Sequence, residues 1–541
     1  MAVIQNIDIT REQHETVRSL LDRHLPNTEA WAYGSRVRWT SRPESDLDVV
    51  VFAQPTQARA VGDLREAFSE SHLSFRVDLF VWDDVPRSFR CQIESEHVVL
   101  VHGKSINVSA LRPDWTRLNL GEVCTKIGSG ATPRGGKDVY MSHGPYALIR
   151  SQNVLNEGFQ EDGLAYIGGA HASQLKNVEV AEEDVLLNIT GDSVARVCQV
   201  RSDVLPARVN QHVAIVRPNP TKLDPCFLRY ALVSPEMQTK LRSWAGSGAT
   251  RNALTKGMIE SLCVAAPRDV CVQRDIAQIL GTLDDKVELN RSMNQKLEAI
   301  GHALFRSWFV DFEPVRAKME GRDTGLPQDT ARLFPDSLGK NGLPRGWQMS
   351  TFGEHVLNFD ARRVPVSRAQ RANMQGRFPY HGAAGVLDHV NDYLFDGTFL
   401  LLGEDGSVLD KSGLAVTQYV SGQFWVNNHA HVLQGKGAVS TEQAYLHFAF
   451  EPISPFVTGA VQPKLSQRRM NQIPFVYAGE DTCRAFAQAI GASFARLRAN
   501  VRESVALAAV RDALLPKLIS GEIGVSEAER SVEAATNRAD A

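Results

Sequence analysis

The sequence has little cysteine, no strong charge bias and no long apolar run. Its 7 cysteines are scattered over 541 residues without a CxxC pair, which argues against a zinc site and against a disulfide framework. The apolar runs, such as residues 47–52, are too short to span a bilayer, and the N-terminus lacks the apolar core of a signal peptide. We therefore expect a cytoplasmic protein with no membrane partner.

Several catalytic motifs are also missing. We find no NPPY or DPPY motif of amino-methyltransferases, no GxxxxGK[ST] phosphate loop and no PD…ExK nuclease cluster. The net charge of −3 does not indicate a basic nucleic-acid-binding chain as a whole. Methylation, nucleotide-driven motion and DNA cleavage would have to come from partner proteins.

One stretch, residues 272–309, predicts a single long helix without proline. Seam positions recur alternately four and three apart, as in Ile276, Leu280 and Leu283, and this is a heptad pattern. At roughly 1.5 Å per residue the helix would be about 55 Å long. Residues 482–520 repeat the pattern, with Asn500 in the place of Asn290. An asparagine in such a seam fixes the register of two helices when it pairs with a polar group opposite.

Further matches show that the chain contains two related halves, which we call the first repeat (residues 109–271) and the second repeat (residues 346–481). The matches keep their order, and each half ends in its long helix, so we infer a duplication. The matched segments are GDSVA at 191–195 with EDGSVL at 404–409, VNQHVAIV at 209–216 with VNNHAHVL at 426–433, and ATRNALT at 249–255 with AVQPKLS at 460–466.

His212 and His429 occupy matched positions in the two repeats. No set of cysteine or carboxylate partners accompanies them in the sequence, so we interpret them as structural histidines and not as metal ligands.

The N-terminal region combines a tight turn with three acids. Gly34 and Ser35 follow a predicted strand, while Asp46 and Asp48 open a β-branched run, where a period of two places both carboxylates on one face. Asp78 lies in a further predicted strand. Three carboxylates on adjacent strands can hold two divalent ions, an arrangement that serves phosphoryl or nucleotidyl transfer.

This conjunction resembles the minimal nucleotidyltransferase domains of the polymerase-beta type, over about residues 10–105. The resemblance implies that Asp46, Asp48 and Asp78 are catalytic metal ligands. It also implies that Gly34, Ser35 and Arg36 hold the nucleotide. Mg²⁺ and a nucleoside triphosphate are the cofactors expected if the domain is active.

Residues 114–525 resemble the specificity subunit of type I restriction-modification systems. The segments that carry the resemblance are GATP at 130–133, LIRSQNV at 148–154, LLNITGDSVARV at 186–197, VNQHVAIVRP at 209–218, LFRSWFVDFEPV at 304–315 and LLPKLISGEI at 514–523. In that family two target recognition domains read a bipartite DNA site, and two methyltransferase subunits and the restriction subunits dock on the same chain. Double-stranded DNA and these subunits are the partners that the resemblance implies.

The expected fold is α+β and multidomain. A small α/β nucleotidyltransferase-like domain precedes two mixed, mainly β target recognition domains, each followed by a long helix, and the two helices pair as an antiparallel coiled coil. The expected boundaries are 1–108 for the first domain, 109–271 and 346–481 for the recognition domains, 272–312 and 482–525 for the helices, 313–345 for a linker, and 526–541 for a disordered tail.

Basic and amide side chains in loops are the candidates for DNA contacts, because Lys and Arg bind phosphates and loop side chains reach base edges. A stretch without any acid, residues 361–377, carries five arginines. The candidates in the first repeat are Arg134, Lys137, Arg150, Asn153, Arg251 and Lys256. Those in the second repeat are Arg362, Arg363, Arg368, Arg371, Lys464, Arg468 and Arg469.

Three hypotheses remain open from the sequence. The chain is a non-catalytic DNA-recognition scaffold with a nucleotidyltransferase-like domain. Alternatively, it is a nucleotidyltransferase, antitoxin-like or partner-modifying, that a DNA-binding body targets. In the third, the N-terminal domain is an inactive interaction module.

Overall fold

The computed structural model divides the chain into two compact units, Met1–Arg117 with Ala265–Arg268, and Leu118–Val264 with Asp269–Ala541. It describes residues 7–26, 28–42, 45–53, 57–82, 85, 93, 96–101, 112–246, 252–459 and 461–539. Within these residues, no helix is both long and apolar enough to cross a membrane.

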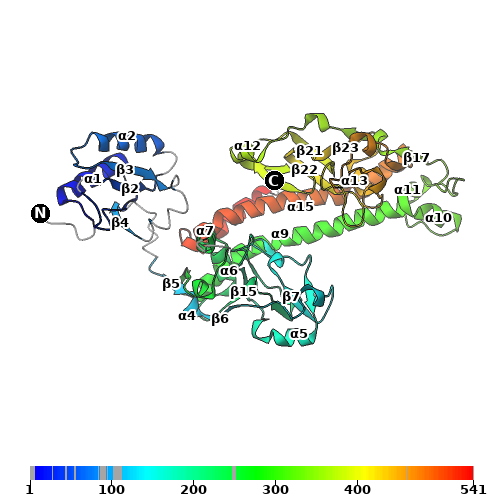
Figure 1. The fold of residues 1–541 in the computed structure, drawn as a ribbon. Helices are drawn as coiled ribbons and strands as arrows, with labels where there is room; N and C mark the ends of the chain where they lie inside the picture. The colour runs from blue at the N-terminus through cyan, green and yellow to red at the C-terminus, as the bar shows by residue number, and fades with distance from the viewer. Residues whose placement is uncertain are drawn as a thin grey trace. The chain divides into compact units, whose positions relative to one another are not determined.

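In the first unit the described residues form a four-stranded sheet and the helices α1 and α2 (Figure 1). The strand order is β3-β2-β1-β4, with β2 and β3 parallel and the other neighbours antiparallel. A capping box at Thr10 begins α1. The Thr10 side chain accepts a hydrogen bond from the backbone amide of Gln13, and the Gln13 side chain accepts one from the backbone amide of Thr10. The bounds are α1 Arg11–His24, β1 Ala30–Tyr33, β2 Leu47–Val51, α2 Ala58–Ser69, β3 Val77–Val81 and β4 His97–Val101.

The first repeat contains two four-stranded sheets, ordered β10-β7-β14-β11 and β13-β12-β15-β6. Strands β12 and β15 are buried on both faces, as their near-continuous apolar sequences require. The principal bounds are β5 Trp115–Asn119, β6 Cys124–Ser129, β7 Tyr146–Ile149, β10 Ala165–Ile167, α5 Gly169–Gln174, β11 Glu179–Val180, β12 Val185–Asn188, β13 Val197–Gln199, β14 Ala207–Val209, β15 Val213–Pro218, α6 Pro225–Val233, α7 Pro235–Gly246, α8 Lys256–Glu260 and β16 Cys263–Pro267.

The second repeat is built on a six-stranded sheet, ordered β18-β23-β21-β22-β19-β20, together with the pair β17-β24. Its core is rich in phenylalanine and joins the ends of both long helices. The bounds are β17 Gln348–Thr351, β18 Val356–Asn358, α12 Arg368–Ala372, β19 Gln375–His381, β20 Val386–Val390, β21 Phe395–Gly403, β22 Thr417–Val426, β23 Ala430–Gly435, α13 Thr441–His447, α14 Gln467–Met470 and β24 Pro474–Tyr477.

Both predicted long helices are present and lie side by side (Figure 1). Helix α9 spans Val270–Phe305 and continues as a π-helical turn to Val310, while α15 spans Glu480–Ser520 and contains Pro516. The residue pairs in contact run in opposite directions along the two helices. They are Asp284 with Arg511, Asn294 with Asn500, and Phe305 with Phe486.

The two seam asparagines are fully buried and face polar groups of the opposite helix. Asn290 Nδ2 donates to Glu503 Oε2 at 3.0 Å, and Asn500 Nδ2 donates to Asn294 Oδ1 at 2.8 Å. A shift of one helix along the other would bury these amides against apolar side chains, so they define the register.

One expectation about the connecting segments is wrong, and the other segment contains secondary structure. The tail expected to be disordered forms α16, Val525–Ala539, because Ala528 is fully buried and the helix contacts α9 and α15. The linker 313–345 contains α10, Glu313–Met319, and α11, Gln328–Arg332. It also contributes Phe334 to the core, where that ring packs edge-on against Trp308.

Candidate functional sites

The turn after β1 approaches an acid so closely that only glycine fits. Gly34 has a positive φ of 83°, and a Cβ atom there would lie 2.2 Å from Asp48 Oδ2. The left-handed backbone and the lack of space each disfavour any side chain. The Asp48 carboxylate is therefore held directly against the turn backbone.

The three predicted acids lie close together in the sheet. Asp48 in β2 and Asp78 in β3 are direct neighbours in parallel register, and exposed Asp46 precedes β2. Burial, and then the charges of Asp78 and Asp46, raise the pKa of Asp48. Burial, Asp48 and Asp78 also raise the pKa of Tyr33 to about 12. Negative charge accumulates at this point of the sheet, which favours a cation.

The chemistry of these groups fits a hard divalent ion, because all three side chains offer carboxylate oxygens. Asp78 is partly neutralised by Arg76, whose Nε lies 3.0 Å from Asp78 Oδ1. Among the described residues, the acids do not bring one oxygen each to within 4.8 Å of one another. An ion that binds there has to draw the carboxylates together.

The two other predicted nucleotide contacts differ in their placement. Ser35 lies half-buried in the turn. The Arg36 guanidinium is buried, donates to the carbonyls of Ser45 and Asp8 at 2.7–2.9 Å, and stacks on Phe75. These bonds tie the turn to the rest of the domain, so we no longer expect Arg36 to contact a nucleotide.

The repeats share one set of backbone hydrogen bonds, which we call the frame. The bonds of the first repeat are Ile189 N to His212 O, Gly191 N to Asn252 O and Leu254 N to Ile189 O, at 2.8–3.1 Å. Those of the second are Glu404 N to His429 O, Gly406 N to Pro463 O and Leu465 N to Glu404 O, at 2.8–3.0 Å. In each repeat the matched histidine amide also donates to the side chain of an asparagine two residues earlier. The duplication inferred from sequence is therefore present in three dimensions.

Eight of the candidate DNA contacts are exposed at the surface of the repeats. Lys256 begins α8 and pairs with Glu260, and Arg362 stacks on Phe395 while it donates to the Leu394 carbonyl. The exposed set consists of Arg134, Lys137, Lys256, Arg362, Arg368, Lys464, Arg468 and Arg469.

The other candidates have structural contacts. Asn153 is fully buried, where its amide bonds the backbone of Arg150 and Gln160, and the Arg150 guanidinium donates to the Gly163 carbonyl. In the second repeat Arg371 pairs with Asp388, and Arg363 lies in the charge cluster described next. We therefore withdraw Arg150, Asn153, Arg363 and Arg371 as DNA contacts. Arg251 lies outside the described residues.

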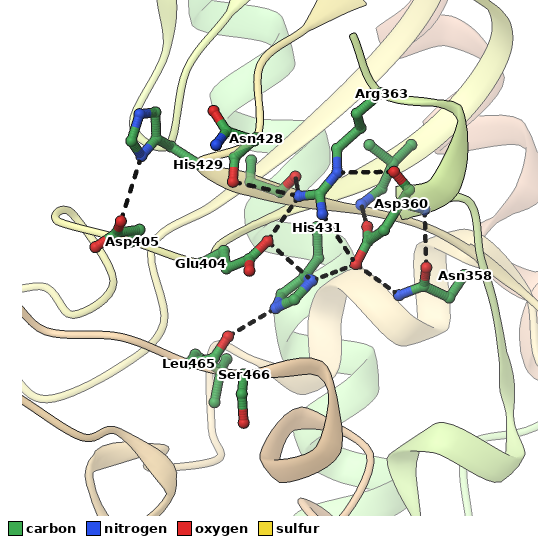
Figure 2. Close-up of polar contacts among 12 residues, drawn as sticks. Asn358, Asp360, Arg363, Glu404, Asp405, Asn428, His429, His431, Leu465 and Ser466 are labelled. Atoms are coloured by element: carbon green, nitrogen blue, oxygen red, sulfur yellow. Dashed lines mark hydrogen bonds and ion pairs between the residues drawn. The ribbon is translucent and has the colours of Figure 1, made fainter. Parts of the chain in front are cut away.

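A largely buried charge cluster, consisting of Asp360, Arg363, Glu404 and His431, adjoins the frame of the second repeat through Glu404 (Figure 2). Arg363 Nη1 lies 2.7 Å from Glu404 Oε2, and His431 Nδ1 lies 2.6 Å from Asp360 Oδ2. Burial by itself raises the pKa of Asp360, but hydrogen bonds from His431 and from the Val432 amide lower it overall. Asp360 is therefore ionised at neutral pH.

Both nitrogens of His431 face acceptors, since Nε2 lies 2.8 Å from the Leu465 carbonyl oxygen. The Arg363 guanidinium contacts both carboxylates, 3.5 Å from Asp360 Oδ2 and 2.7 Å from Glu404 Oε2. Asp360, Glu404 and His431 are close enough to hold a metal ion, but a metal would have to displace Arg363 from Glu404 and break the contacts of His431. We interpret the cluster as an ionic clasp.

Sequence reasoning missed this clasp. Its members come from three segments, and His431 lies 71 residues from Asp360. The one available signal was a histidine inside an apolar strand, in the place where the first repeat has Ala214.

Comparison with known proteins finds a family match for the N-terminal domain and another for the first repeat. Residues 15–105 match the family model "Polymerase beta, Nucleotidyltransferase", and residues 113–299 match "Type I restriction modification DNA specificity domain". The chain joins a nucleotidyltransferase domain to a type I restriction specificity domain. The second repeat lies outside both matched ranges and is related to the specificity domain through the frame.

Two curated relatives come from Haemophilus influenzae. The chain is 30% identical over 221 residues to the type I restriction enzyme HindI specificity subunit, covering 41% of this chain and 46% of that protein. The chain thus spans about half the length of this relative. It is 37% identical over 101 residues to the probable protein adenylyltransferase MntA, covering 18% of this chain and 89% of that protein. The nucleotidyltransferase domain therefore matches nearly all of a separate small protein.

Among solved structures, a type I restriction-modification S subunit from M. genitalium is similar at 15% identity. The alignment covers 76% of this chain and 97% of that chain, with a TM-score of 0.44.

Proposed function

We propose that this chain is the DNA-recognition subunit of a type I restriction-modification complex. Each repeat reads one half of a bipartite double-stranded DNA site. The antiparallel helices α9 and α15 form a coiled coil that fixes the distance between the two readers. Methyltransferase subunits, two in number, and restriction subunits dock on the same chain and supply the catalysis.

The observation that carries this proposal is the shared frame. Two domains that share these backbone bonds and differ in the side chains beside them are suited to bind two different half-sites, much as dimers bind two half-sites at a fixed spacing. Exposed basic residues in both repeats, such as Arg134 and Arg468, are suited to phosphate contacts. We retain the domain boundaries given above, except for the tail and the linker.

The experiment is co-expression with the methyltransferase partner, followed by single-molecule sequencing of methylated host DNA. We expect methylated bases at one split motif with a fixed gap, and deletion of residues 1–108 should leave that motif unchanged. A complex that forms but methylates no split motif would contradict the proposal.

We further propose that the N-terminal domain transfers a nucleotidyl group to a hydroxyl group of a partner protein. Asp46, Asp48 and Asp78 are the residues that would hold Mg²⁺. A bound Mg²⁺ neutralises charge on the triphosphate and on the attacking oxygen. The turn at Gly34 and Ser35 presents backbone and a hydroxyl group to the phosphates. The hydroxyl oxygen forms a bond to the α-phosphorus and gives up its proton to solvent, while the bond between the α-phosphorus and the bridging oxygen breaks and pyrophosphate leaves.

Thermal denaturation with and without Mg²⁺ tests the metal site, and labelled ATP tests the transfer. We expect Mg²⁺ to raise the melting temperature of the wild-type chain and label to appear on a partner protein. Asp48→Asn should abolish both effects, whereas Asp63→Asn, which changes an exposed acid on α2, should abolish neither. Equal responses of the two variants would leave an inactive interaction module as the better description.

A further inference from the structure

The surface beside the frame of the first repeat is a polar hollow of about 400 Å³. Its side chains offer hydrogen-bond donors and acceptors from three separate segments. The main lining residues are Gln152, Thr190, Asp192, Ser193, Arg196 and His212. Of the basic residues selected from the sequence, those that the structure describes do not line this hollow.

A chain of side-chain hydrogen bonds leads from Thr190 and His212, which line the hollow, to Gln211 and Thr132 beside it. The Thr132 hydroxyl donates to Gln211 Oε1 at 2.6 Å, and Gln211 Nε2 lies 2.9 Å from His212 Nε2. Because an amide nitrogen only donates, His212 Nε2 accepts, and its Nδ1 proton points to Thr190 Oγ1 at 2.5 Å. Gln211 is exposed yet held in one orientation, so binding would cost little side-chain entropy.

The second repeat keeps an amide and a histidine at the matched positions and changes the neighbouring hydroxyl group of Thr190 to the carboxylate of Asp405. Asn428 stands in the place of Gln211 and is exposed, and the His429 side chain is 46% exposed. His429 Nδ1 lies 3.7 Å from Asp405 Oδ2, in the position where the first repeat has Thr190 (Figure 2). The Gln462 amide donates to the other Asp405 oxygen at 2.9 Å, which orients this carboxylate as well.

We propose that Gln211 with His212, and Asn428 with His429, read base edges in the two half-sites. This inference rests on the proposed function and identifies the residues that choose the bases. Backbone bonds maintain the frame, so these side chains are not needed to hold it. Gln and Asn amides match the donor and acceptor pair of adenine in the major groove, and a carboxylate such as Asp405 accepts from cytosine.

The difference between the repeats supports a reading role over a structural one. The frame bonds agree to within a few tenths of an ångström, while the side chains beside them change from Gln and Thr to Asn and Asp. A shared set of backbone bonds beside which a hydroxyl group is exchanged for a carboxylate is expected if each repeat selects its own bases.

The test is the methylated motif of the co-expressed complex, read by single-molecule sequencing. Gln211→Ala and His212→Ala should each reduce base discrimination in one half-site on the order of tenfold and leave the other half-site unchanged. Asn428→Ala should do the reverse. Gln174→Ala, an exposed glutamine on α5, is the matched control and should change neither half-site.

The outcomes separate this inference from the proposed function. If the wild-type complex yields no split motif, the proposed function fails and the inference fails with it. A wild-type motif that all three alanine variants retain unchanged would overturn the inference alone, and so would relaxation of both half-sites by one variant with an unchanged melting temperature. If an alanine variant unfolds, Gln211→Glu carries the test, because it keeps the shape and should shift one position of that half-site from adenine toward cytosine.

Discussion

The two repeats maintain the same frame in different ways. Ile189 and Ala214 occupy apolar, buried places in the first repeat, where the second has Glu404 and His431 of the ionic clasp. Apolar packing is non-directional and tolerates small changes, whereas a buried charge cluster is stable only when every partner is present. The comparison teaches that the same frame bonds can be supported by apolar packing or by a charge cluster. The two kinds of support differ in their sensitivity to mutation and to pH.

The largest effect should follow from removal of one cation of the clasp. Arg363→Met leaves Glu404 and Asp360 buried with too little positive charge, so the second repeat should lose about 3–5 kcal/mol of unfolding free energy. Urea denaturation measures the loss. The control is Arg368→Met, an exposed arginine five residues away, which should change stability by less than about 0.5 kcal/mol. Equal effects of the two substitutions would remove the contrast between the repeats.

A double-mutant cycle sharpens this result. Arg363 and Glu404 are in direct contact, so Glu404→Gln should cost less in the Arg363→Met background than in the wild-type chain, where it breaks the pair. The coupling free energy should be roughly 1–3 kcal/mol. Additive losses would mean that the two residues stabilise the repeat independently, contrary to the clasp.

Acidification should weaken the clasp. The pKa of Asp360 is lowered in the folded chain, so its stabilisation is complete above the unfolded-state pKa of about 3.9 and is lost as pH falls through the folded value. Urea midpoints at pH 7, 5 and 3.5 should show that the wild-type advantage over Asp360→Asn shrinks at the lowest pH. A difference that stays constant over this range would contradict the assigned charge state.

The smallest effect belongs to the apolar repeat. Ile189→Val removes one methylene group from a buried side chain and should cost about 1 kcal/mol. Because no charge is involved, the loss should be the same at pH 7 and pH 5. Urea denaturation of this variant and of Arg363→Met compares the loss of unfolding free energy from apolar packing with the loss from the charge cluster.

The sequence predicted those features that depend on short-range periodicity. The seam of α9 follows from heptad spacing, and the meeting of Asp48 with Asp78 follows from two strands that each carry an acid near the start. Gly34 was predicted from its turn, although the contact with Asp48 that forbids a side chain appears only in the fold.

The remaining features depend on tertiary contacts that no local pattern encodes. Arg362 and Arg363 are adjacent in sequence, yet one is exposed and the other is buried in the clasp. The C-terminal tail has a polar composition, yet it docks as a helix, with Ala528 buried among the residues whose exposure is described. The direction of each side chain determines which of the two arginines is exposed. The surface offered by α9 and α15 determines that the tail docks as a helix.

The ionic clasp also has an evolutionary consequence. Duplicated segments within one gene tend to become identical when recombination copies one over the other. Copying residues 189–191 of the first repeat into the second would replace Glu404 by isoleucine and leave Arg363 with one fewer partner, while the reverse exchange would bury a carboxylate in an apolar site. Either product would be unstable, so the clasp acts as a barrier that preserves two distinct halves in one chain.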